Sequence, residues 1–125
     1  MGYTRYWERT EKPMAVDFMG FCREVFDTCE KLGIEIHNYD GYGKPTVKKD
    51  MIAFNGDGEN NLDHESCVIS NEIGFNFCKT ARKPYDYAVR TILREALTRG
   101  YITELSDDGT NEEIISDEDF VARRY

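Results

Sequence analysis

The chain has 125 residues, of which 40% are hydrophobic and 13% aromatic, enough for one domain with a core. Its 24 acidic residues outnumber the 16 basic ones and give a net charge of -8, which repels nucleic-acid phosphates. We therefore expect no generic DNA binding. An acidic surface of this kind either simply keeps a protein soluble or imitates nucleic acid and occupies a basic partner protein.

The sequence contains no segment that we expect to cross or enter a membrane. No apolar run is long enough to span a bilayer and no charged-then-apolar leader is found, so we expect a cytoplasmic protein without a membrane partner. The cysteines form no C-x-x-C pair, and His37 and His64 form no H-x-x-x-H pair, so we expect no metal site and no cofactor. The cysteines expected in the core are Cys22, Cys29, Cys67 and Cys78.

The first elements of the chain follow clear periodic patterns. Residues 2–9 alternate and are rich in aromatic residues, which predicts a strand with Tyr3, Arg5 and Trp7 on one face. Apolar residues at helical spacing predict a helix over residues 14–32. This helix needs nothing more than a core to pack against.

The middle of the chain predicts short strands separated by turns. A strand is expected over residues 34–38, with Glu35 and His37 sharing one face. Residues 39–45 contain two glycines and predict a turn. The next strand is expected over residues 50–55, followed by a flexible acidic loop over residues 56–61.

The second half adds strands and a second long helix. The remaining predicted elements are strands over residues 66–70 and 75–78, a helix over 84–99, a strand over 101–105 and a capped helical turn that opens at Ser116. Hairpin-length connections join the middle strands, which favours an α+β fold. We expect one domain over residues 1–125, with an antiparallel or mixed sheet of about five or six strands and two main helices packed on one face.

Positive charge gathers where the strand over residues 75–78 gives way to the helix. Lys79, Arg82 and Lys83 lie within five residues of one another in an acidic chain. Cations beside the free N–H groups of a helix start make an anion site, in which arginine binds phosphate bidentately and lysine supplies a point charge. Since cations oppose the helix dipole here, we expect a bound anion or a carboxylate partner. The alternative is an ordinary solvated helix start.

Other polar residues are expected to join this cluster. Asn55 ends one strand, His64 precedes the next and Lys79 ends the one after, so consecutive antiparallel strands place all three at the same end of the sheet. We predict that they line one concave surface. The predicted ligand-binding residues are Asn55, His64, Lys79, Arg82, Tyr85 and Asp86, with Tyr85 in the wall and Asp86 orienting Arg82 or Lys79.

A catalytic alternative uses the same surface. His64 and Glu65 would serve as base and acid, with Lys79 or Arg82 stabilising developing charge on a nucleotide. Adjacent residues on a strand point to opposite faces, which makes joint action on one atom difficult. The plain alternative is a loop histidine beside a loop carboxylate.

Four segments resemble those of a family of small phage and bacterial proteins. They are residues 1–7, residues 54–56, the pair at 64–65, and residues 77–86, which read Phe-Cys-Lys-Thr-Ala-Arg-Lys-Pro-Tyr-Asp. The resemblance spans most of the chain, and its last string is specific. It implies phage-linked biology and assigns no reaction. The family often has a histidine where this chain has Arg5, so no catalytic role is carried over to that position.

The leading hypothesis from the sequence is a phage-type counter-defence protein in the host cytoplasm. It would bind, and sequester, a small phosphate-bearing nucleotide signal at the basic junction. One alternative is a hydrolase or phosphodiesterase that acts on a nucleotide with His64 as base. Another is an acidic inhibitor of a host defence protein, which would use the acidic run over residues 104–113. A homo-oligomer is left open.

Overall fold

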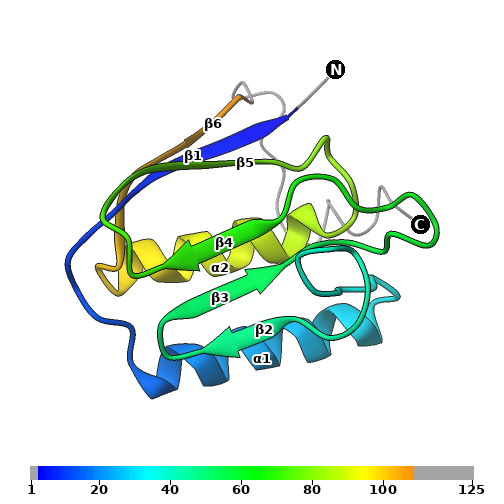
Figure 1. Cartoon of the computed structure of the whole chain (residues 1–125), viewed down its shortest axis with the longest axis horizontal. Coiled ribbons are helices and arrows are strands. Elements are labelled where there is room, and N and C mark those ends of the chain that lie inside the picture. Colours follow the sequence, from blue (N-terminus) through cyan, green and yellow to red (C-terminus); the bar gives the residue numbers. More distant parts are fainter. Residues whose placement is uncertain (1–2, 109–125) are drawn as a thin grey trace.

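The computed structural model describes residues 3–108, and the helical turn predicted at Ser116 lies outside this range. The described part contains two helices and six strands, which confirms the α+β class (Figure 1). In chain order the elements are β1 (Thr4–Arg9), α1 (Val16–Lys31), β2 (Thr46–Lys48), β3 (Met51–Phe54), β4 (Cys67–Ser70), β5 (Gly74–Lys79), α2 (Asp86–Thr98) and β6 (Ile102–Asp107).

The strands form two three-stranded antiparallel sheets, ordered β5-β1-β6 and β2-β3-β4. The expected single sheet with both helices on one face is therefore not confirmed. β4 and β5 follow each other in the chain but belong to different sheets. Where they meet, Glu65 N donates to Lys79 O at 3.1 Å, whereas Lys79 N donates to the side-chain Oε1 of Glu65 at 3.0 Å. The Glu65 carboxylate thus accepts a hydrogen bond that a backbone carbonyl would accept in a continuous β-ladder.

Both helices lie within two residues of their predicted bounds, and both end at a glycine. Gly33, with φ 77°, donates to Glu30 O, and Ile34 N donates to Cys29 O. Gly100, with φ 82°, repeats this pattern after α2. These are Schellman motifs, in which one residue has a left-handed backbone conformation that only glycine adopts without strain. The two helices pack against each other, α1 also against β2 and α2 also against β6.

In the middle of the chain one predicted strand is wrong and one observed strand was not predicted. Residues 34–38 form a single antiparallel bridge, in which His37 and Asn55 exchange two backbone hydrogen bonds of 2.9 Å. β3 already pairs with β2 and β4 at its two edges, so this segment reaches only the end of β3. The strand that was not predicted is β2, whose three residues are too few to show a period of two.

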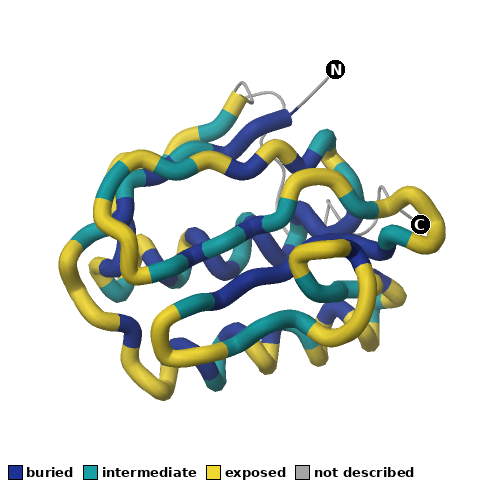
Figure 2. The backbone as a smooth tube through the Cα atoms, in the orientation of Figure 1, coloured by how far each residue is buried: buried dark blue, intermediate teal, exposed yellow. Residues whose placement is uncertain are grey.

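Buried hydrophobic residues of both helices and both sheets form one cluster. Figure 2 colours the buried residues dark blue along the backbone. All four cysteines are buried and free, as expected. Burial raises the pKa of Cys22 and of Cys29 to about 12, so both thiols stay protonated at neutral pH. Neither described helix combines the length and the apolar character needed to cross a membrane.

Two glycine substitutions are expected to change stability in opposite directions. A Cβ at Gly56 would lie 2.0 Å from Leu62 O and 2.9 Å from Tyr85 Cδ1, whereas a Cβ at Gly20 in α1 meets nothing within 4 Å. Gly56→Ala should lower the free energy of unfolding by about 3 kcal/mol through overpacking. Gly20→Ala should raise it by about 1 kcal/mol, because alanine has the higher helix propensity. Urea unfolding measures both, and equal effects would contradict the packing described here.

Candidate functional site

The loops around the predicted site are joined by one buried side chain, that of Asn55, which is 3% exposed. Its Nδ2 donates to Tyr39 O at 3.2 Å and to His64 O at 2.9 Å. Its Oδ1 accepts from Gly56 N at 2.8 Å and from His64 N at 3.0 Å. Two donors and two acceptor sites are the full capacity of an amide side chain. Asn55 is therefore occupied by the protein itself and does not face a ligand.

The segments that carry His64 and Lys79 meet at the same end of the structure, as expected. Glu65 is hydrogen-bonded to Lys79 through both its backbone and its carboxylate. Tyr85 is fully buried and its hydroxyl donates to Glu65 O at 2.5 Å. Burial raises the pKa of Tyr85, which keeps this hydroxyl a donor. Tyr85 thus supports the junction from inside the core. We had expected its side chain in the wall of a pocket.

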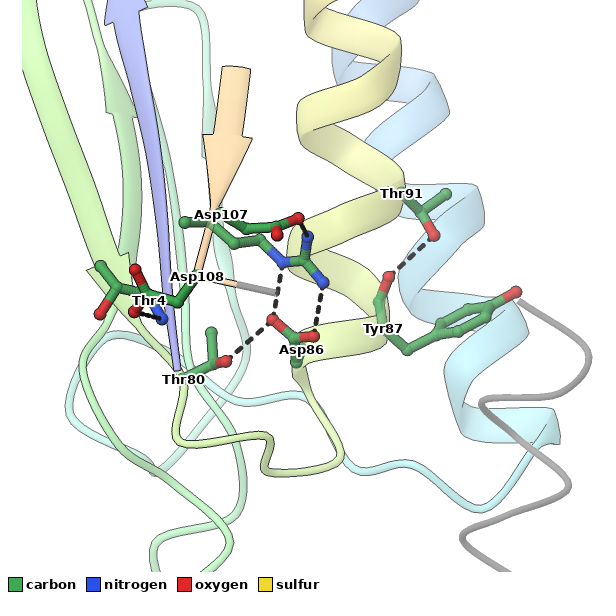
Figure 3. Close-up of polar contacts among 8 residues, drawn as sticks. Thr4, Thr80, Asp86, Tyr87, Thr91, Asp107 and Asp108 are labelled. Atoms are coloured by element: carbon green, nitrogen blue, oxygen red, sulfur yellow. Dashed lines mark hydrogen bonds and ion pairs between the residues drawn. The ribbon is translucent and has the colours of Figure 1, made fainter. Parts of the chain in front are cut away.

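Asp86 is also turned inward, toward Thr80 (Figure 3), and it binds Arg5 of β1. Arg5 Nε donates to Asp86 Oδ1 at 2.8 Å, and Arg5 Nη2 donates to Asp86 Oδ2 at 2.7 Å. Thr80 Oγ1 also donates to Oδ1, at 2.8 Å. Burial lowers the pKa of Arg5, but the hydrogen bonds and the charge of Asp86 outweigh this and raise it. The expectation that Asp86 orients Arg82 or Lys79 is therefore corrected, since Arg5 and Thr80 occupy its carboxylate.

The start of α2 does not offer the free N–H groups that we expected. Asp86 N donates to Lys83 O at 2.9 Å, Tyr87 N to Pro84 O at 3.2 Å and Ala88 N to Tyr85 O at 2.9 Å. The preceding turn satisfies these donors, and the Asp86 carboxylate lies in the first turn, where it complements the helix dipole. An anion at this junction would therefore depend on side-chain cations.

The cations themselves remain near the surface. Lys79 and Arg82 are exposed, and the Arg82 guanidinium lies 4.2 Å from the ring centroid of Tyr3. Lys83 Nζ donates to Asn61 O at 2.8 Å, which ties the junction to the acidic loop. Ala81 and Arg82 both adopt the left-handed conformation, with φ 52° and 56°. Such conformations strain residues other than glycine.

An aromatic surface that the sequence did not predict lies beside Lys79. Phe75 and Phe77 on β5 are 60% and 48% exposed, and Tyr6 of β1 stacks on Phe75 with ring centroids 6.1 Å apart. Phe75 and Phe77 are also 6.1 Å apart. Cys78 is buried, so Lys79 alternates back to the side of the phenylalanines. We call Tyr6, Phe75, Phe77 and Lys79 the aromatic face.

Of the six predicted binding residues, three are exposed and three are buried. The exposed ones are His64, Lys79 and Arg82, and the buried ones are Asn55, Tyr85 and Asp86. The contact of Arg5 with Asp86 was not predicted, although the alternation of residues 2–9 indicates that Arg5 needs a partner. The alternation assigns Arg5 to the face shared with Tyr3 and Trp7, and a cation on a buried face requires a partner.

The two alternative functions find less support in these contacts. The side chains of His64 and Glu65 are exposed, and the Glu65 carboxylate is engaged with Lys79 N. The acidic run over residues 104–113 is described only as far as Asp108. Comparisons with protein-family models, with curated proteins and with solved structures found no match to this chain.

The pair of Asp86 with Arg5 is expected to contribute strongly to stability. Asp86→Asn removes one charge of a buried pair and should lower the free energy of unfolding by about 3 kcal/mol. Asp17 is the matched control, since it also lies in the first turn of a helix and pairs with Arg99 at 2.7 Å, but its side chain is 72% exposed. Asp17→Asn should cost less than about 1 kcal/mol. Urea unfolding at one pH compares them, and a small loss for Asp86→Asn would contradict this role.

The Asn55 amide is tested by an isosteric change. Asn55→Asp replaces two buried N–H donors with oxygen opposite two carbonyls, and we expect a loss of about 3 kcal/mol or more. Asn38 is the control, because its Oδ1 accepts from Thr46 Oγ1 at 2.8 Å and an aspartate keeps that acceptor. Asn38→Asp should change stability by about 0.5 kcal/mol or less. Thermal unfolding of both variants decides whether donation by Asn55 matters.

Proposed function

We propose that this protein binds a small phosphate-bearing nucleotide on the aromatic face, with the base stacked on Phe77 and Phe75 and a phosphate held by Lys79. The observation that carries the proposal is the exposure of two phenylalanines on the same side of β5 as a lysine. Exposed phenylalanines have no role in the core of the domain. Together with a cation they match the two chemical parts of a nucleotide.

The physical chemistry of each part supports a nucleotide ligand. A base stacked on an aromatic side chain contributes about 1–3 kcal/mol and needs no particular sequence. Lysine binds phosphate as a compact point charge, and a chain with a net charge of -8 disfavours long polyanions. A mononucleotide or small cyclic nucleotide therefore fits better than a nucleic-acid strand.

Arg82 is the second cation that we assign to the phosphate. It stands three residues after Lys79, in the turn between β5 and α2. Two hydrogen bonds of Thr80 hold this turn in place, because Thr80 N donates to Tyr3 O and Thr80 Oγ1 donates to Asp86 Oδ1. Left-handed backbone at Ala81 and Arg82 costs about 1–3 kcal/mol per residue and is enriched at ligand sites. This strain supports a functional turn.

The biological role that we propose is sequestration of a nucleotide signal. Binding without turnover needs no catalytic pair, and the resemblance to small phage and bacterial proteins suggests a signal of the host's defence. Hydrolysis of the ligand is the competing outcome, and it would require His64 as base. The two outcomes differ in whether the ligand is recovered intact.

We expect the native protein to bind at least one member of a panel of mono-, di- and cyclic nucleotides. Phe77→Ala should weaken this binding by about tenfold or more, because a stacked base is lost, while Phe77→Tyr should preserve it. Lys79→Ala should also weaken binding, whereas Lys48→Ala, which removes an exposed lysine from β2 in the other sheet, should not. Isothermal titration calorimetry measures all four variants.

Two results would contradict the proposal. One is the absence of binding to every nucleotide in the panel, and the other is equal affinity in Phe77→Ala, Lys79→Ala and Lys48→Ala. Chromatography of the ligand after long incubation tests turnover separately. Intact ligand supports sequestration, whereas hydrolysis that His64→Ala abolishes while binding survives would replace it with the enzyme alternative.

A further inference from the structure

Three metal-ligating side chains converge where the bridge between His37 and Asn55 joins two loops. The side-chain ligand atoms of Glu35, His37 and Asp57 all lie within 4.8 Å of one another. His37 Nε2 is 3.6 Å from Glu35 Oε1 and 3.8 Å from Asp57 Oδ1. This cluster is distinct from the aromatic face and from the residues that the nucleotide proposal uses.

The orientation of His37 directs an unused nitrogen at the two carboxylates. Its Nδ1 lies 2.9 Å from Gly43 O, and because a carbonyl only accepts, Nδ1 carries the proton. In the neutral ring Nε2 then bears a lone pair. Nε2 is buried and has no hydrogen-bond partner within the part of the chain that the structure describes. A backbone carbonyl that fixes the tautomer from the other ring nitrogen is a regular feature of metal-bound histidines.

The backbone holds the three ligands in place. The bridge of His37 with Asn55 places Glu35 opposite Asp57, since both lie two residues beyond the bridged pair. Asp57 is 4% exposed, and its carboxylate accepts from Asn60 Nδ2 at 2.5 Å and from Glu59 N at 3.1 Å. These two hydrogen bonds hold the buried Asp57 carboxylate in place, with its Oδ1 3.8 Å from His37 Nε2.

Like charges opposite each other in this way are unfavourable. A cation between the two carboxylates would remove the repulsion.

The separations at His37 Nε2 are too long for direct hydrogen bonds and lie at, or slightly beyond, the spacing of two ligands on one metal. N···O hydrogen bonds measure about 2.7–3.2 Å, shorter than both distances at Nε2. Ligands about 2.0–2.2 Å from one metal at tetrahedral angles lie roughly 3.3–3.6 Å apart. We propose that Glu35, His37 and Asp57 form a binding site for a divalent first-row transition metal, Zn²⁺ or Mn²⁺. One imidazole with two carboxylates is a donor set that suits these ions better than Ca²⁺, which takes oxygen ligands.

The proposed site is accessible from one side. Glu35 and His37 also line an open pocket of about 810 Å³ between α1 and the segment that leads into β2. With three protein ligands, a metal keeps coordination positions for water or a ligand from this pocket. The sequence led us to expect no metal, because its two histidines form no spacing motif. The donors come together only through the bridge between distant segments.

Metal binding by the tag-free protein of 125 residues tests the proposal. After chelator treatment and dialysis, we expect ZnCl₂ or MnCl₂ to bind with one equivalent per chain in calorimetry and elemental analysis, and to raise the melting temperature. Glu35→Gln and His37→Gln should each weaken binding at least about tenfold, the scale on which even outer-shell partners of a metal act. Glu35→Gln is the safer variant for folding, because this side chain is 62% exposed.

Glu30→Gln is the matched control, since Glu30 lines the same pocket and lies outside the cluster. It should bind metal like the native protein. Co²⁺ serves as a spectroscopic probe, and we expect no thiolate charge-transfer band, because all four cysteines are buried. The proposal is overturned if the native protein binds neither Zn²⁺ nor Mn²⁺, if Glu35→Gln and His37→Gln both bind with native affinity, or if a thiolate band appears.

Discussion

The hydrogen-bonding capacity of the Asn55 side chain is the constraint on which the arrangement of loops depends. A buried amide is stable only when its donors and acceptors are paired, and here backbone groups of Tyr39, Gly56 and His64 pair them all. The same residue bridges His37 through its own backbone. One residue therefore holds the segment of His37 through its backbone and the segment of His64 through its side chain.

A second buried contact determines what the strand-to-helix junction can offer a ligand. Arg5 takes both oxygens of Asp86, so this carboxylate is directed into the protein and not toward the basic cluster. The start of α2 is satisfied by its own preceding turn. Any affinity for an anion must then come from Lys79 and Arg82 at the surface, and the exposed phenylalanines beside Lys79 favour a ligand that also carries a base.

The two proposals assign different chemistry to two separate parts of the structure, the aromatic face on β1 and β5 and the cluster beside the end of β3. The aromatic face combines apolar rings with a cation, whereas Glu35, His37 and Asp57 combine two carboxylates with a neutral nitrogen. An acidic protein with both features can hold a cation and an anion at separate sites. Because the two sites share no residue, each can be tested without disturbing the other.

The sequence by itself determined the features that depend on neighbours along the chain. Both helices, their terminal glycines, the alternation of β1 and the burial of the cysteines follow from local periodicity and local backbone preference. Only the tertiary structure decided which sheet a strand joins, which side of β5 faces solvent and which partner a charged residue meets. Asp86 and Arg5 are 81 residues apart, and Glu35 meets Asp57 across a bridge between loops. Such contacts depend on desolvation and strand pairing over long separations, which no local pattern records.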